Sequence, residues 1–175
     1  MGLAMVHGII KNHGGIIMVD SNIGKGTIFE ILLPEVYGTT IPKDDTDKDM
    51  PRGKESILFI DDEPSICKIG RKMLERLGYK IETYIDPLLA LEKFKNRPDD
   101  FHLVISDMTM PKMAGDTLIE EILKIRPEIP TMISTGFSDK IIQNTIDESS
   151  VTEFIEKPFS LEVLAQSVQK ALQRM

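Results

Sequence analysis

Residues 56–64 read "SILFIDDEP", and this stretch decides the fold. The unbroken apolar run at Ser56–Ile60 is typical of a strand that is buried on both faces of a parallel sheet. Asp61 and Asp62 end that run, and Pro64 then stands where the first turn of a helix tolerates proline. A buried strand, an acidic turn and a helix in this order indicate the first half of a β-α-β unit.

The chain downstream repeats this alternation of short apolar runs and longer amphipathic segments. We expect further strands at residues 80–84, 102–106, 130–134 and 151–156, and helices at 64–77, 87–96, 116–125, 139–148 and from 161 onward. Because crossovers between parallel strands are right-handed, these segments predict an α/β fold: a doubly wound sheet of five parallel strands.

The first of these helices is predicted to bury one apolar stripe and to end at Gly78. The stripe consists of Ile66, Ile69, Met73, Leu74 and Leu77. Cys67 flanks it and is expected to be a buried, unreactive thiol. It is the only cysteine in the chain, so an internal disulfide is excluded.

Charge and composition narrow the classes of partner. The 175 residues include 28 acidic and 21 basic ones, which give a formal net charge of -7. This balance argues against nucleic acid or an anionic membrane as the main partner. The apolar runs are too short to cross a bilayer, so we expect no direct membrane contact and a cytoplasmic location, with any anchor of a longer parent outside this segment.

Ionisable and hydroxyl side chains gather where the predicted strands end. Asp61 and Asp62 follow the first strand, Asp107 the third, Thr135 the fourth and Lys157 the fifth. The carboxyl ends of parallel strands share one edge of the sheet, which is where open α/β sheets bind ligands. Converging carboxylates favour a small hard cation such as Mg²⁺, and the lysine and threonine could bind phosphate oxygens beside it.

Four motifs, in this order and spacing, carry a resemblance to a known family. They are "FIDDEP" (59–64), "VISDMTMPKMAG" (104–115), "ISTGFSD" (133–139) and "FIEKPFS" (154–160). With them, residues 55–175 resemble the receiver domain of two-component response regulators. The resemblance implies the flavodoxin-like strand order 2-1-3-4-5.

The resemblance also implies a role for each site residue. Asp107 would be the phosphoacceptor. Asp61, Asp62 and Asp107, with the main-chain carbonyl of Thr109, would bind Mg²⁺, for which Mn²⁺ is a possible substitute. Positioning and cationic charge supply most of the catalysis in phosphoryl transfer, which gives the metal and Lys157 their function.

A switch is implied as well. Thr135 would hydrogen-bond the phosphoryl group, and the aromatic residue Phe154, where the family more often has tyrosine, would change rotamer with it. The peptide bond before Pro158 is expected to be cis, and Gly115 is expected to be structural, ending the loop after Asp107.

The first 35 residues resemble a different part of a signalling protein. "GLAMVHGIIKNHGG" (2–15) and "IIMVDSNIGKGTIFEILLP" (16–34) are similar to the helix and closing strand pair of the ATP-binding domain of sensor histidine kinases. We therefore expect a helix and β-hairpin remnant at 1–35, a linker at 36–54 and the receiver at 55–175, within a hybrid histidine kinase. The remnant is not expected to bind ATP or to support ATP-dependent kinase activity, and neither His7 nor His13 is expected to be catalytic.

The favoured function is therefore a phosphorelay receiver that catalyses its own phosphorylation and dephosphorylation at Asp107. The expected partners are the kinase core of the parent protein and a histidine phosphotransfer protein, and a homodimer is possible. One alternative is a pseudo-receiver, an interaction module that works without phosphorylation. Another is a small Mg²⁺-dependent phosphatase, which would turn over phosphate esters repeatedly.

Overall fold

The computed structural model describes residues 2–24, 26–34, 50–136 and 151–173. The chain forms two compact units, Met1–Asp45 and Thr46–Met175, and each is described by itself. The boundary between them falls inside the segment that the sequence assigns to a linker.

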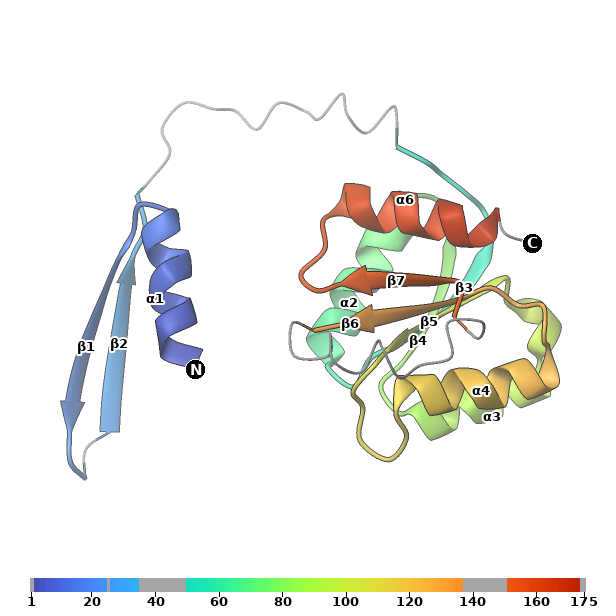
Figure 1. The fold of residues 1–175 in the computed structure, drawn as a ribbon, viewed down its shortest axis with the longest axis horizontal. Coiled ribbons are helices and arrows are strands. Elements are labelled where there is room, and N and C mark those ends of the chain that lie inside the picture. Colours follow the sequence, from blue (N-terminus) through green and yellow to red (C-terminus); the bar gives the residue numbers. More distant parts are fainter. Residues whose placement is uncertain (1, 25, 35–49, 137–150, 174–175) are drawn as a thin grey trace. The chain divides into compact units, whose positions relative to one another are not determined.

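The first unit is one helix and one β-hairpin. Helix α1 (Gly2–Asn12) precedes strands β1 (Ile16–Asn22) and β2 (Gly26–Leu32), which pair antiparallel (Figure 1). Gly24 and Gly26 have φ angles of 78° and 99°, a backbone that glycine adopts without steric cost. The helix and hairpin predicted for this segment are thus confirmed.

This unit leaves most of its apolar side chains exposed. Ile10 is the one described side chain of the unit that is buried, with 6% of its surface exposed. The exposed apolar side chains are those of Val6, Ile9, Ile16, Met18, Val19, Ile23, Ile28, Phe29, Ile31, Leu32 and Leu33. A helix and a hairpin bury too little surface to form a core of their own.

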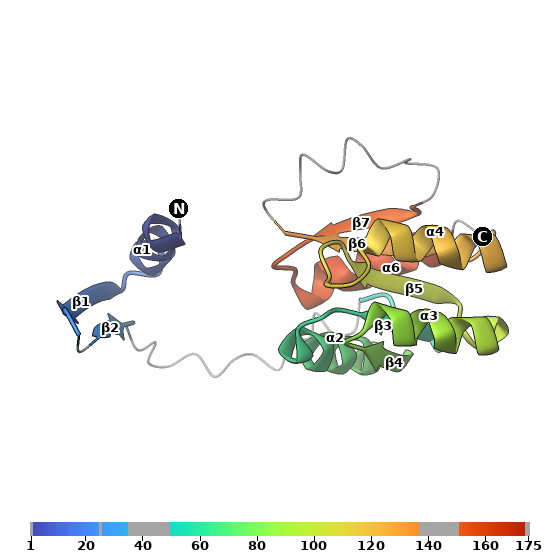
Figure 2. The same ribbon diagram turned by 90° about the horizontal axis from the view of Figure 1, so that it is seen from below.

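The second unit is a five-stranded parallel sheet with helices on both faces (Figures 1 and 2). Its elements are β3 (Ser56–Ile60), α2 (Pro64–Arg76), β4 (Lys80–Tyr84), α3 (Pro87–Asn96), the 3₁₀ turn η2 (Pro98–Asp100), β5 (Leu103–Asp107), α4 (Gly115–Ile125), β6 (Thr131–Thr135), β7 (Glu153–Glu156) and α6 (Leu161–Leu172). The strand order β4-β3-β5-β6-β7 is the expected 2-1-3-4-5.

Among the described residues, two helices cover each face of this sheet. Helices α2 and α6 lie on one face and α3 and α4 on the other (Figure 1). Alternate residues of a strand point to opposite faces, so Ile57 and Phe59 join the core under α2 and α6, while Leu58 and Ile60 join the core under α3 and α4. The apolar run at Ser56–Ile60 is therefore continuous because the strand is buried on both faces of the sheet, as the sequence predicted.

The stripe predicted for helix α2 is only partly right. Leu74 and Leu77 are fully buried, but Ile69 is 56% exposed. The buried stripe instead runs through Cys67 and Gly70, because a side chain at Gly70 would meet the ring of Phe59 at 2.7 Å. Ile66 and Met73 are partly buried against the core as predicted, and with Ile69 they also line a surface groove.

Local signals set most element boundaries. Asp86 accepts a hydrogen bond from the Leu88 amide and caps α3, and Ser160 caps α6 in the same way. Gly78 has a φ of 98° and ends the turn after α2, as predicted. Residues 50–54, which the sequence assigns to the linker, belong to the second unit, where the Gly53 amide bonds to the Leu77 carbonyl at 3.2 Å. The helix predicted at 139–148 lies outside the described residues.

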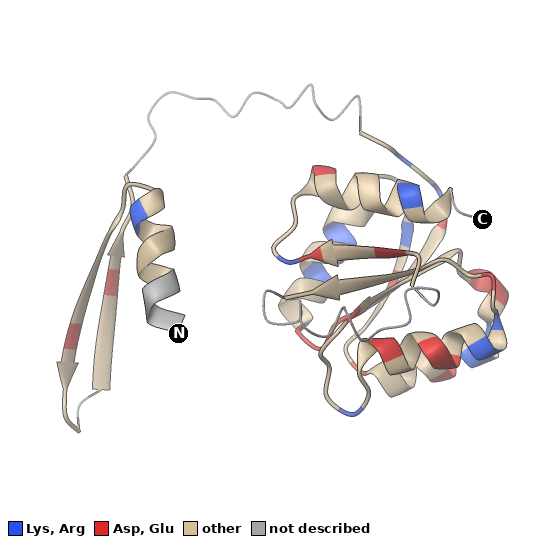
Figure 3. Cartoon of the chain, viewed as in Figure 1, with Lys and Arg blue, Asp and Glu red and all other residues tan. Residues whose placement is uncertain are grey.

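Charges of both signs are interspersed on the second unit, for example along α3 and α4 (Figure 3). Within the described part of the chain, no helix has the length and apolar character needed to span a membrane.

Candidate functional site

Four strands deliver the site residues to one edge of the sheet. Asp61 directly follows β3, Asp107 and Thr135 end β5 and β6, and Lys157 follows β7. Register brings them together, since Asp107 pairs with Ser134 and Thr135 with Glu156, the neighbour of Lys157. The prediction that these four residues lie at one edge of the sheet is confirmed.

The Lys157 ammonium group joins two acidic residues. Its Nζ donates hydrogen bonds to Asp61 Oδ2 at 2.6 Å and to Asp107 Oδ1 at 2.5 Å. All three side chains are largely buried, with exposed fractions of 19% for Lys157, 1% for Asp61 and 11% for Asp107. A charged group in such surroundings needs a partner, and each of these has one.

Burial and pairing act against each other in the pKa values of this cluster. Burial alone lowers the pKa of Lys157, but the hydrogen bonds and charges of Asp107 and Asp61 outweigh it and raise that pKa above its ordinary value. Lys157 is therefore an ammonium ion at neutral pH. Burial raises the pKa of Asp107, while the hydrogen bond and charge of Lys157 oppose the rise.

Backbone amides of the two loops that follow β3 and β5 also face the acidic pair. The Thr109 amide donates to Asp107 Oδ2 at 3.1 Å, and the Glu63 amide donates to Asp61 Oδ1 at 3.0 Å. The loop after β5 is closed by a hydrogen bond from the Gly115 amide to the Met108 carbonyl at 2.9 Å. Each carboxylate is thus oriented by one amide and by the shared lysine.

Two of the three carboxylates expected to bind Mg²⁺, those of Asp61 and Asp107, lie together in the structure. Among the described residues, no three His, Cys, Asp or Glu side chains lie together closely enough to hold a metal ion. Lys157 brings Asp61 and Asp107 together, whereas Asp62 is half-buried and takes no part in these two contacts. Since Mg²⁺ usually takes one or two carboxylates and completes its shell with water, the donor set fits this ion.

The two residues of the expected switch lie on neighbouring strands. Thr135 is fully buried, and its carbonyl accepts a hydrogen bond from the Lys157 amide at 2.8 Å. Phe154 is partly buried and packs against the apolar cluster that includes Met108 and Ile133. Met108 is the neighbour of Asp107, the expected phosphoacceptor, so Phe154 packs against a cluster that includes the residue next to Asp107.

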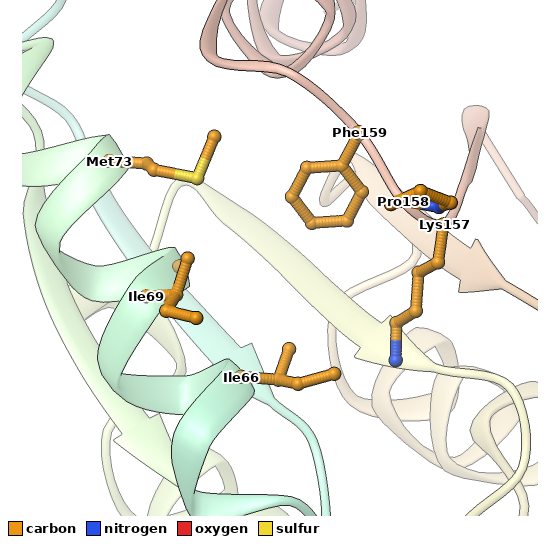
Figure 4. A pocket seen from close by; sticks show the side chains of 7 residues that line it. Ile66, Ile69, Met73, Lys157, Pro158 and Phe159 are labelled. Carbon is orange, nitrogen blue, oxygen red and sulfur yellow. The ribbon is translucent and has the colours of Figure 1, made fainter. Parts of the chain in front are cut away.

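An apolar groove of about 380 Å³ adjoins Lys157. Ile66, Ile69 and Met73 of α2 form one wall, and Pro158 and Phe159 form the other (Figure 4). This groove could not be predicted from the sequence, in which the spacing of the three α2 residues indicates a core position. Their aliphatic character was a visible signal, but only the position of Phe159 shows that they line a surface.

Two smaller expectations are also met. The Lys157–Pro158 peptide bond is cis. Cys67 is 5% exposed, its thiol donates to the Asp61 carbonyl at 3.2 Å, and burial raises its pKa. This thiol is a packing group with no sign of activation.

Sequence comparisons match this chain to a receiver-domain family and to sensor kinases. The family described as response regulator receiver domain matches residues 57–169. The chain is 32% identical to the sensor kinase CckA of Brucella abortus, over 99% of this chain and 19% of that protein. It is 28% identical to the aerobic respiration control sensor protein ArcB of Escherichia coli, over 97% of this chain and 22% of that protein. The chain thus spans about a fifth of the length of these relatives.

Solved structures resemble the second unit. A receiver domain protein from Clostridium thermocellum superposes with a TM-score of 0.65 at 30% identity, over 69% of this chain and 95% of that one. The chemotaxis protein CheY4 of Vibrio cholerae superposes with a TM-score of 0.63 at 26% identity, over 69% of this chain and all of that one.

Proposed function

Because the chain belongs to the family of response regulator receiver domains, we propose that it accepts one phosphoryl group on Asp107 from a phosphohistidine. The Asp107 carboxylate attacks phosphorus, the bond from phosphorus to the imidazole nitrogen breaks, and that nitrogen keeps the electron pair. The product is an acyl phosphate on Asp107. The observation that carries this proposal is the buried Asp107 carboxylate held between the Lys157 ammonium group and the Thr109 amide.

Each neighbour of Asp107 has a task in this scheme. Lys157 balances the negative charge of the incoming phosphoryl oxygens, and it is already desolvated and in place. Asp61, Asp107 and the Thr109 carbonyl would hold Mg²⁺, or Mn²⁺ as a substitute, and Asp62 would have to turn toward them to join. When bound, the ion neutralises phosphoryl oxygens as the charge spreads in the transition state.

The phosphorylated state is signalled through Thr135 and Phe154. The Thr135 hydroxyl moves to hydrogen-bond the phosphoryl group, and Phe154 repacks against the cluster that contains Met108. The packing of Phe154 on this cluster supports the assignment.

We infer a hybrid sensor histidine kinase as the longer protein, working in the cytoplasm. The alignments with two sensor kinases extend over nearly the whole chain, residues 1–35 included, which supports this reading. Residues 1–35 are then the end of its ATP-binding domain, and the exposed apolar side chains of α1, β1 and β2 are covered by the rest of that domain. The kinase core supplies the phosphoryl group, and a histidine phosphotransfer protein receives it.

The apolar groove is the proposed docking surface for the histidine-bearing partner. A donor must bring its phosphohistidine to Asp107, and the groove begins at Lys157, which contacts Asp107 directly. Ile69 is 56% exposed in this groove, as expected for a residue that packs on a partner.

The variant Ile69→Asp separates docking from chemistry. Phosphoryl transfer from a histidine phosphotransfer protein should slow about tenfold or more, because a charge is buried at the interface, while phosphorylation by acetyl phosphate should be unchanged. Leu89→Asp is the matched control, since Leu89 is 54% exposed on α3, on the opposite face of the sheet. Equal slowing in both variants would refute the groove as the docking surface.

The phosphoacceptor proposal itself is tested by an intact mass spectrum after incubation with acetyl phosphate. A single Mg²⁺-dependent phosphoryl adduct is expected on the wild type, and none on Asp107→Asn, which keeps the size of the side chain. Absence of the adduct from the folded wild type would favour the pseudo-receiver alternative. Sustained release of phosphate from esters would favour the phosphatase.

A further inference from the structure

The loop that follows Asp107 contains an unusual turn at Lys112. Its φ is 70°, and it is the one residue other than glycine with a positive φ in the described part of the chain. The Met113 amide bonds to the Pro111 carbonyl at 2.9 Å, so the chain reverses over three residues. Such a turn is rare for a residue with a side chain, and its surroundings must hold it in place.

One ion pair holds the tip of the loop. Lys112 Nζ donates to Asp86 Oδ2, and this hydrogen bond keeps the pKa of Asp86 below its ordinary value. The other carboxylate oxygen of Asp86, Oδ1, accepts from the Leu88 amide at 3.0 Å and caps α3. Asp86 therefore fastens the loop tip to the first turn of that helix.

The base of the same loop faces the phosphoacceptor. The Thr109 amide donates to Asp107 Oδ2, and the next residue, Met110, is buried in the cluster with Ala90 and Phe94 of α3. The loop thus rests on α3 through Met110 and is tied to it a second time through Lys112. Thr109 lies between the strand end and these two attachments.

We propose that the Lys112–Asp86 ion pair is a clamp that positions the Thr109 backbone against Asp107. This inference rests on the proposed function, in which Thr109 contributes its amide to the acceptor and its carbonyl to the metal. Without the clamp, the strained turn loses the contact that offsets its cost, and the loop spends less time with the Thr109 amide on Asp107. Lys112 and Asp86 are positioning residues that do not touch the phosphoryl group.

The expected effect is modest, because Lys112 is 58% exposed and solvent weakens such a pair. Asp86→Asn is the sharpest variant, since asparagine can still cap α3 but cannot pair with the ammonium group. Solvent exchange of the Thr109 amide, followed by NMR, should become about three- to fivefold faster, and adduct formation with acetyl phosphate should slow by about the same factor. Lys112→Gln should match it, and the double variant should be no worse than either single one.

Two comparisons isolate the clamp. Lys124→Gln removes an ammonium group that is 66% exposed and paired with Glu121 on α4, and it should leave both readouts unchanged. Raising the salt concentration should shrink the difference between wild type and Asp86→Asn, because screening weakens the pair. Unchanged Thr109 exchange in Asp86→Asn would overturn the inference. If the wild type takes up no phosphoryl group, the proposed function fails, and Thr109 exchange alone decides on the clamp.

Discussion

Replacing Gly115 with alanine should lower the free energy of unfolding of the second unit by about 3 kcal/mol or more. A Cβ atom at this position would lie 2.1 Å from the Asp107 carbonyl oxygen and 3.0 Å from Ser106 Oγ. The nearest atom belongs to the backbone of a buried central strand and cannot rotate away. The strand end that carries Asp107 must therefore shift, and adduct formation should be lost with it.

The same substitution at Gly8 is the control, because a Cβ there meets nothing within 4 Å. Gly8 lies in α1 of the first unit, so Gly8→Ala should leave the unfolding of the second unit unchanged. Urea unfolding followed by circular dichroism measures both variants. A midpoint for Gly115→Ala equal to that of the wild type would contradict the close approach seen here.

Replacing Lys157 with methionine should slow adduct formation about 100-fold, by analogy with the loss of one charge-stabilising donor at other sites. The methionine keeps much of the apolar chain but removes the ammonium group that joins Asp61 and Asp107. Lys170→Met is the matched control, because Lys170 is 57% exposed and pairs with Glu153 away from the site. A Lys157→Met variant as fast as this control would remove Lys157 from the mechanism.

The same variant should change the pH dependence of stability. Lys157 is the largest influence that lowers the pKa of Asp107, and burial and Asp61 both raise it, so the pKa should rise further when the lysine is removed. A carboxyl group that binds protons more tightly in the folded state than in the unfolded chain adds stability at low pH and loses it as the pH rises through its folded pKa. Urea midpoints of Lys157→Met should therefore recover toward those of the wild type under acidic conditions.

Much of the fold could be predicted because several local signals agreed. Strand β3 coincides with the apolar run at Ser56–Ile60. Helix α3 begins after the cap at Asp86, and the turn after α2 ends at Gly78, so local sequence and tertiary structure agree. The exposure of Ile69 on α2 could not be predicted, because hydrophobic periodicity ranks Ile69 above Gly70 as a core residue. The actual packing depends on the ring of Phe59, which needs the space that a glycine leaves.

The site was predictable in outline and not in its contacts. Strand ends placed Asp61, Asp107 and Lys157 at one edge, but nothing in their spacing shows that one ammonium group bridges both carboxylates. The clamp between Lys112 and Asp86 was not visible either, because those residues are 26 positions apart and the pair depends on how the loop folds over α3. Side-chain pairing of this kind follows from tertiary packing.

Asp107 is proposed to be the phosphoacceptor, and locating the phosphoryl group on the chain decides this. The wild type would be phosphorylated with acetyl phosphate and Mg²⁺, treated with borohydride, which reduces an acyl phosphate on aspartate to homoserine, and mapped by peptide mass spectrometry. Homoserine at position 107 alone is the expected result. Homoserine at Asp61 or Asp62, or at no position in a chain that carries the adduct, would contradict the assignment.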